Sequence, residues 1–450
     1  MQKSLIAVLM AGAFFSLNAQ AADLIQVYQQ ALANDATYAS ARAALAAGRE
    51  RFPQGRALLL PTVGMTGSVS NGNSDSSPFN EGQPNGSGGF VTGSSGSLVS
   101  TNLYTVSLQQ PLFRWANWQS YQQSKLAVSI AEAQFAQAQQ DLITRVAQAY
   151  FDVLAAQDTL ESTRAQKTAV TEQLASAKRN FEVGTQTITD THEAQAANDL
   201  VVAQEFAAVN DLENRRAALQ AIIGAAPSAL ATLKPGVTLA PPQPMSIEPW
   251  ISSAETQNYG VVVSELSLES AKRDIARNRA GHYPTLDLVA NTRRDRLSGQ
   301  TPASGTRTDS AIGVQWSVPI FNGFAVTSRV RESIALEDKA RNDLEANRRN
   351  AALGVRQAFL GVNSGMAQVK ALQAAEVSSQ SALESNRLGY QVGVRINIDV
   401  LNAQRQLYST RTDLARARYN TIMSGLRLKA AAGSLREADL VPVNALLTNN

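Results

Sequence analysis

The side chains that could do chemistry in this chain are few. Its 450 residues include no cysteine and two histidines. Without cysteine, a disulfide, a thiolate–metal site and a catalytic thiol are all excluded. His192 and His282 fall in different predicted elements, so a zinc site has almost no support. Two acidic pairs have helical spacing, Asp158 with Glu161 and Glu265 with Glu269. An acid–base pair needs a pocket, and a solvated helix face is the simpler interpretation.

The remaining composition also excludes function classes. The sequence has no nucleophile–base–orienter set, and no glycine-rich loop is followed by Gly-Lys-Ser or Gly-Lys-Thr. We therefore expect no enzyme and no cofactor. The net charge of +3 gives no support for nucleic-acid binding.

Two aspartates hold equivalent places in a tandem duplication. Asn180–Thr185 of the first copy corresponds to Gly389–Val394 of the second, and Asp190 corresponds to Asp399 at the same spacing. A carboxylate at such a place has a simple explanation, because a helix N-terminus stabilises it by ~0.3–1 kcal/mol. A repeat this long is not a short-period solenoid and implies two copies of one structural unit.

Each copy contains a long helix with a heptad pattern. In the first copy a seam of spacing seven includes Val146, Val153, Leu160, Lys167 and Leu174, and the second copy has Val355, Val362, Val369, Glu376 and Leu383. Such seams predict coiled-coil packing. The segment 119–181 lacks Pro and Gly, which allows roughly 95 Å of helix at about 1.5 Å per residue. Lys167 and Glu376 interrupt the seams at one level, either as two solvated charges or as an ion pair between neighbouring helices at that level.

Both long helices end at a Val-Gly pair, Val183-Gly184 and Val392-Gly393. Glycine after a helix favours a left-handed stop. Returning helices follow at about 188–224 and 397–433, so each copy forms a helical hairpin. The segments are 22–224 for the first repeat, 225–247 for a linker, 248–433 for the second repeat and 434–450 for a tail expected against the linker.

Four segments before the long helices alternate apolar and polar residues, at about 61–71, 101–112, 284–297 and 308–320. Period two over this length fits a transmembrane β-strand as well as a half-buried soluble strand. The Gly/Ser-rich segments 71–100 and 298–307 are expected to be surface loops. Arginines gather near one of them, Arg293, Arg294, Arg296 and Arg307, either as a solvated loop or in contact with anionic lipid head groups.

The first 21 residues are predicted to be a secretory signal peptide. Lys3 precedes a short apolar run, and Ala19–Ala21 forms a cleavage site of the A-x-A kind. Without cysteine, no lipid can be attached to an N-terminal thiol. If the strands cross a membrane, four of them cannot close a barrel, since about eight is the practical minimum. An open edge is not tolerated in lipid, so the chain must assemble with copies of itself.

These features together resemble the TolC family of bacterial outer-membrane channel proteins. The resemblance rests on the duplication, the paired Pro-Thr and Pro-Leu/Ile-Phe strand edges, and the paired Val-Gly-x-x-x-x-x-Asp turns, and it covers the chain from about 22 to 435. It implies a mainly α fold with a small transmembrane β part. A homotrimer would share a 12-stranded β-barrel in the outer membrane of a Gram-negative bacterium and a periplasmic α-barrel.

The resemblance also implies a function and partners. The trimer would be the exit duct of efflux pumps or type I secretion systems, docking on a periplasmic adaptor and an inner-membrane ABC or proton-driven transporter. The sequence does not name the cargo, drugs or a secreted protein. The rival interpretation is a soluble periplasmic coiled-coil adaptor or structural protein, which does not explain the four amphipathic strands.

The resemblance extends to a gate at the hairpin tips. Tyr390 and Arg395 would match residues that tie the second hairpin to its neighbours, with Thr189 and Asp190 as their partners, and Asp399 would match a ring that narrows the pore. Two positions depart from the family pattern. Asn402 stands where a second ring aspartate is expected, and Arg179 stands where a glutamine would bond the tyrosine. Arg179 would then approach Asp190 or repel Arg395. A single ring of carboxylates in place of two should weaken the attraction of cations to the pore.

Overall fold

The computed structural model describes residues 21–76, 95–299 and 305–448. The predicted signal peptide, apart from its last residue, lies outside these ranges. The fold is mainly helical with one four-stranded sheet, so the predicted fold class is confirmed. None of the helices in the described ranges combines the length and the apolar character needed to cross a membrane.

Contacts divide the chain into two compact units that differ from the two repeats. Unit 1 comprises Met1–Ala44, Ala133–Val263 and Glu345–Asn450, and unit 2 comprises Leu45–Glu132 and Ser264–Leu344. Each unit therefore draws on both repeats. The long helices α4 (Trp115–Glu182) and α8 (Ala325–Gln391) contribute residues to both units.

Unit 2 holds the sheet. Its antiparallel strands follow the order β1 (Thr62–Ser76), β2 (Ser95–Phe113), β3 (Thr285–Gly299) and β4 (Gly305–Ser317). The central pairing of β2 with β3 joins the two repeats, and β1 and β4 are the edges. Unit 2 also contains α3 (Arg51–Ala57), a short 3-10 turn at Ala280–His282, and α7 (Tyr259–Arg279) from Ser264 onward.

The strand ends differ from the predicted ones in two ways. β1 and β2 extend into the predicted loop 71–100, to Ser76 and from Ser95, and β3 and β4 extend into the predicted loop 298–307, to Gly299 and from Gly305. Backbone pairing does not require alternating apolar side chains. β4 stops at Ser317 instead of about 320. The next residues include Pro319, whose lack of an N–H prevents it from donating to a strand ladder.

The two faces of the sheet have opposite character. Across the register Val63 opposes Leu108, Leu108 opposes Ala290 and Ala290 opposes Ile312, so these four residues share one face. That face is exposed, with Val63 at 68%, Met65 at 69% and Ile312 at 77% relative exposure. The opposite face carries mainly small and polar residues, among them Thr66, Thr105, Arg293 and Asp309.

Unit 1 is built on two helical hairpins. The first combines α4 with α5 (Ile188–Ile223), and the second combines α8 with α9 (Asn397–Ala431). Gly354, Gly361 and Gly365 do not break α8. At Gly365 an added Cβ would lie 2.5 Å from Thr421 Oγ1 on α9, so glycine allows these two helices to approach closely.

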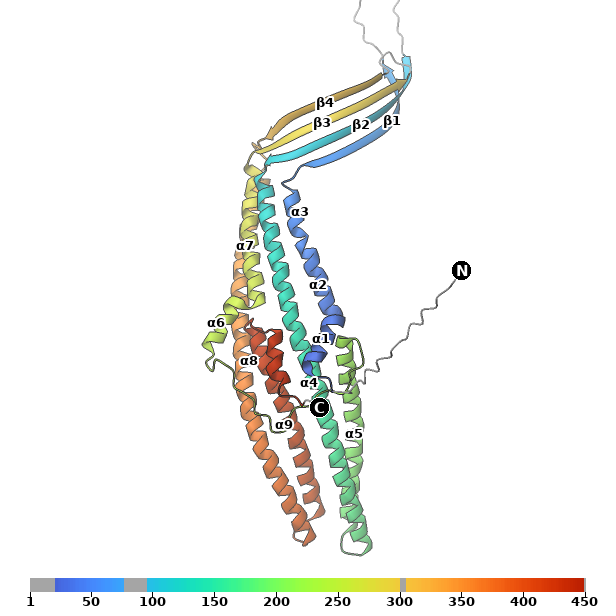
Figure 1. Ribbon diagram of the computed structural model, residues 1–450, viewed down its shortest axis with the longest axis vertical. Helices are drawn as coiled ribbons and strands as arrows, with labels where there is room; N and C mark the ends of the chain where they lie inside the picture. The colour runs from blue at the N-terminus through green and yellow to red at the C-terminus, as the bar shows by residue number, and fades with distance from the viewer. Residues whose placement is uncertain (1–20, 77–94, 300–304, 449–450) are drawn as a thin grey trace, which may run out of the picture. The chain divides into compact units, whose positions relative to one another are not determined.

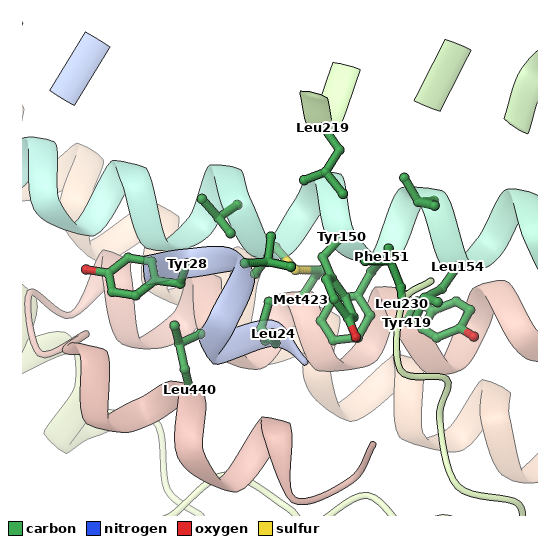
Figure 2. Close-up of a cluster of buried hydrophobic side chains, with 14 of the residues drawn as sticks. Leu24, Tyr28, Tyr150, Phe151, Leu154, Leu219, Leu230, Tyr419, Met423 and Leu440 are labelled. Carbon is green, nitrogen blue, oxygen red and sulfur yellow. The ribbon is translucent and has the colours of Figure 1, made fainter. Parts of the chain in front are cut away.

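The main core of unit 1 surrounds α4 and α9 (Figure 2). Tyr150, Phe151 and Leu154 of α4 pack with Tyr419 and Met423 of α9. The Tyr150 hydroxyl donates a 2.7 Å hydrogen bond to the carbonyl oxygen of Ala231. Because a buried hydroxyl needs a partner, this bond fixes the linker on the core.

The N-terminal segment and the tail also pack on unit 1. α1 (Leu24–Asn34) and α10 (Leu440–Asn444) contribute Leu24 and Leu440 to the core. Leu233 of the linker bridges to Leu447 of the tail, as the sequence predicted. The other helical elements are α2 (Ala36–Arg49), α6 (Glu248–Gln257) and a 3-10 turn at Glu437–Asp439.

Candidate gate at the hairpin tips

The two hairpins turn with the same backbone geometry. Gly184 and Gly393 have φ angles of 75° and 78°, in the left-handed region that glycine adopts without strain. Thr185 N–H donates to the carbonyl oxygen of Asn180 at 2.8 Å, and Val394 N–H donates to that of Gly389 at 2.8 Å. These bonds close the last helical turn in each copy. Both turns lie at the same end of unit 1, beside the exposed Val183 and Val392 (Figure 1).

The returning helices start differently. In α5 the Thr187 hydroxyl accepts from Asp190 N–H at 3.3 Å, and the Asp190 carboxylate accepts from Thr187 N–H at 3.1 Å and from its hydroxyl at 2.8 Å. This reciprocal capping box stabilises the helix start. α9 has no side-chain cap at Ile396. Instead Arg395, in the turn before α9, has its Nη1 3.7 Å from the carboxylate of Asp399 in the first turn of α9.

Tyr390 contacts the first hairpin through a glutamine. Nε2 of Gln186 donates a hydrogen bond to the Tyr390 hydroxyl. The Tyr390 ring also packs on a small cluster of Leu383, Val400 and Leu407. The bond therefore joins the tip of α8 to the turn of the first hairpin.

A buried asparagine makes a second link between the hairpins. Asn397 at the start of α9 is fully buried. Its side-chain oxygen accepts from Nε2 of Gln173 on α4 at 2.6 Å, and its Nδ2 donates to the carbonyl oxygen of Asp190 at 3.1 Å. Both helices of the first hairpin are thus bonded to α9.

Within one chain the residues predicted as a latch bond to groups other than the expected ones. Arg179 donates to the carbonyl oxygen of Ala175 at 3.3 Å, in its own helix. Thr189 is exposed, and the side chain of Arg395 is 58% exposed. The predicted pore residues Asp399 and Asn402 lie in the first two turns of α9. Asp399 is half-buried and Asn402 is exposed.

Sequence reasoning missed three residues of this site: Gln173, Gln186 and Asn397. A signal was present for Asn397. Its counterpart in the duplication is the apolar Ile188, so a polar residue replaces an apolar one at the start of the second returning helix. Gln186 also differs from its counterpart, the charged Arg395. The partners on α4 depend on packing that the sequence does not show.

The interrupted seams are explained by ion pairs within each hairpin. Lys167 Nζ lies 2.7 Å from Glu205 Oε2 and Arg164 Nε lies 3.1 Å from Glu205 Oε1. In the second hairpin Arg411 Nε lies 3.1 Å from Glu376 Oε1. The hydrogen bonds from Lys167 and then Arg164 lower the pKa of the Glu205 carboxyl. Each of the two seam charges therefore pairs with the neighbouring helix of its own hairpin, Lys167 with Glu205 and Glu376 with Arg411, and the two do not pair with each other.

Metal binding has no site in the described part of the chain. No three His, Cys, Asp or Glu side chains come together there in a way that could hold an ion.

Comparisons with known proteins give the family. The family model described as outer membrane efflux protein matches residues 27–225 and 250–434. The chain is 35% identical over 428 residues to the outer membrane protein TolC of Vibrio cholerae, covering 94% of each. It is 32% identical over 440 residues to the alkaline protease secretion protein AprF of Pseudomonas aeruginosa, covering 96% of this chain and 90% of that protein.

Solved structures give the same fold. The crystal structure of the outer membrane protein VceC from Vibrio cholerae superposes with a TM-score of 0.75 at 17% identity, covering 92% of this chain and 96% of that one. Two stretches matched by one family model also agree with a chain built from two copies of one unit. The chain belongs to the outer membrane efflux protein family.

Proposed function

We propose that this chain forms the outer-membrane exit duct of a tripartite export system, as a homotrimer with a large periplasmic part. The observation that carries the proposal is the sheet of unit 2. One face is apolar and exposed, and both edge strands, β1 and β4, have free sides among the described residues. Apolar surface of this kind marks a membrane or protein contact.

Trimerisation would satisfy both features. Backbone groups in lipid must all be paired, so β1 of one copy would pair with β4 of the next. Three sheets of four strands then close a barrel of twelve. The apolar face would contact lipid, and the polar face would line the channel.

Charge gives the sheet an orientation. Arg294 and Arg296 share the apolar face, where Arg294 pairs with Tyr104 and Arg296 pairs with Asn102. Arg293 and Arg307 lie on the other face, where they approach Asp295 at 3.9 Å and Asp309 at 2.8 Å. Arginines at the end of an apolar band suit the lipid head-group region, where anionic groups attract them. We therefore place this end of the strands at the outer-membrane surface.

The hairpins would form the periplasmic duct and its gate. Relatives include a protein named for alkaline protease secretion, and another named for protease secretion in Dickeya chrysanthemi. These names support export through a periplasmic adaptor and an inner-membrane transporter. They favour a secreted protein as one cargo, while the TolC relatives leave small toxic molecules open as another.

In the trimer, we expect Arg395 to reach Thr189 and Asp190 of a neighbouring copy. The exposure of Arg395 and Thr189 in one chain leaves both available for this contact. Asp399 and Asn402 would ring the entrance. The rival, a soluble periplasmic adaptor, does not explain an exposed apolar sheet face.

Fractionation and reconstitution test the proposal. The chain should be recovered from the outer membrane only with detergent, as a trimer, and should form ion-conducting channels in planar bilayers. Recovery of a monomer from the soluble periplasm would support the adaptor instead. Loss of a secreted protein or accumulation of a dye after gene deletion would then identify the cargo.

A further inference from the structure

The contact between the hairpins near their tips depends on one neutral side chain. The amide of Asn397 accepts from Gln173 of α4 at 2.6 Å and donates to the backbone of Asp190 in α5 at 3.1 Å. Asn397 uses both ends of its amide, and each end reaches a different helix of the other hairpin. A carbonyl oxygen has two lone pairs, so that of Asp190 can accept this bond and a helical one.

The surroundings make these bonds hard to replace with water. Asn397 has no exposed surface. The adjacent apolar cluster combines Val170 and Leu174 of α4 with Ala194 of α5 and Leu401 of α9, and Ile398 packs against it. A buried amide that loses its partners bears the full cost of its desolvation. The amide therefore favours one arrangement of α9 on the first hairpin.

The charged groups nearby do not perform the same task. The Asp190 carboxylate bonds the N-cap residue Thr187 of its own helix, and Arg395 pairs with Asp399 of its own hairpin. The direct bonds between the hairpin tips are those of Asn397 and that of Gln186 with Tyr390, all between uncharged groups. Such bonds are insensitive to salt, whereas exposed charge pairs are screened.

We infer that Asn397 is a positioning residue that fastens α9 to the α4–α5 hairpin in the closed duct, as an uncharged clamp within each protomer. This inference rests on the proposed channel function. It assigns the closed state to a residue that only the second repeat carries, because Ile188 occupies the equivalent place in the first. The bonds of Asn397 within each protomer should then persist at high salt as well as at low salt.

The test is single-channel recording of purified trimers carrying Asn397→Asp. An ionised carboxylate still accepts from Gln173 but has no donor for the carbonyl oxygen of Asp190, and a protonated one supplies an O–H donor. Burial raises the pKa of such a carboxyl. For Asn397→Asp we expect the open fraction of the channels to rise about fivefold or more at neutral pH. Acidification should reverse this rise.

Wild-type channels are recorded over the same pH range, so that gating changes caused by titration of Asp190 and Asp399 can be subtracted. Gln195→Leu is the matched control, because the Gln195 amide donates to Asp199 of its own helix and should leave gating unchanged. Asn397→Leu removes both bonds at similar volume, and its open fraction should rise at every pH. If that variant does not assemble, the acid reversal of Asn397→Asp decides alone.

The outcomes separate the two proposals. Wild-type trimers that form no channels would count against the exit duct itself. Channels that form normally, with Asn397→Asp gating like wild type at every pH, would overturn the clamp.

Discussion

The Tyr419 hydroxyl donates a 2.6 Å hydrogen bond to the Asp158 carboxylate and so joins α9 of the second repeat to α4 of the first. Tyr419 also stacks on Phe151, with ring centroids 5.6 Å apart. Burial is the main cause that raises the pKa of Asp158, against the hydrogen bond from Tyr419 that lowers it. The two repeats therefore meet at a carboxylate whose ionised form is disfavoured by burial.

Replacing Asp158 with asparagine should remove a pH dependence of stability. A carboxyl whose pKa is raised by folding binds its proton more tightly in the folded state. Its effect on stability therefore becomes more favourable as pH falls through the folded pKa toward the ordinary value of 3.8. The melting temperature of wild type minus that of Asp158→Asn should therefore rise as the pH falls through this window. Both are measured on detergent-solubilised trimer. A difference that stays flat or falls would contradict the assignment.

Replacing Gly365 with alanine should destabilise the second hairpin. The new Cβ would lie 2.5 Å from Thr421 Oγ1 and 3.3 Å from Thr421 Cβ, on the buried seam between α8 and α9. Overpacking of this kind costs about 1–3 kcal/mol, against a gain in helix propensity of about 1 kcal/mol. Gly354→Ala is the matched control, since its Cβ would meet Ala431 at 4.0 Å. Thermal denaturation should rank Gly365→Ala below wild type and Gly354→Ala at or above it; the reverse order would rule out close packing at Gly365.

A lysine on the apolar face of the sheet should impair membrane assembly. Ile312 lies on that face at 77% exposure, and its neighbour Ala311 lies on the opposite face. A lysine near the bilayer midplane costs about 2–4 kcal/mol, whereas a lysine on the channel side remains in water. Ile312→Lys should reduce the amount of trimer in the outer membrane, and Ala311→Lys should not. Equal yields from the two variants would show that this face does not meet lipid.

Replacing Asn402 with aspartate should increase cation selectivity. Asn402 follows Asp399 by one helical turn and is exposed. Three copies would add a second ring of carboxylates at the entrance, and such rings attract cations and divalent ions. The reversal potential in a KCl gradient should shift toward that of potassium, with stronger block by divalent cations. Asp399→Asn should shift it the other way, and no shift in either variant would place both residues outside the pore.

The duplication, the heptads and the period-two segments were enough to predict a mainly helical chain with four strands. Helix ends and the left-handed turns at Gly184 and Gly393 follow from local chemistry, because glycine alone adopts that conformation freely. The end of β4 before Pro319 also has a local cause, though the pattern suggested a longer strand. The extension of β1 to Ser76 has none, since its Gly, Ser and Asn residues pair through the backbone.

The partners of the candidate gate were beyond the sequence. The sequence by itself determined that Tyr390, Arg395, Asp190 and Asp399 stand at the tips of two equivalent hairpins. Only the tertiary structure decided that Gln186 meets Tyr390 and that Asn397 joins Gln173 to the backbone of Asp190. The physical reason is that periodicity fixes which face of a helix is buried. Hydrogen-bond partners depend instead on how far one helix slides along another, and residues more than 200 positions apart set that distance through packing.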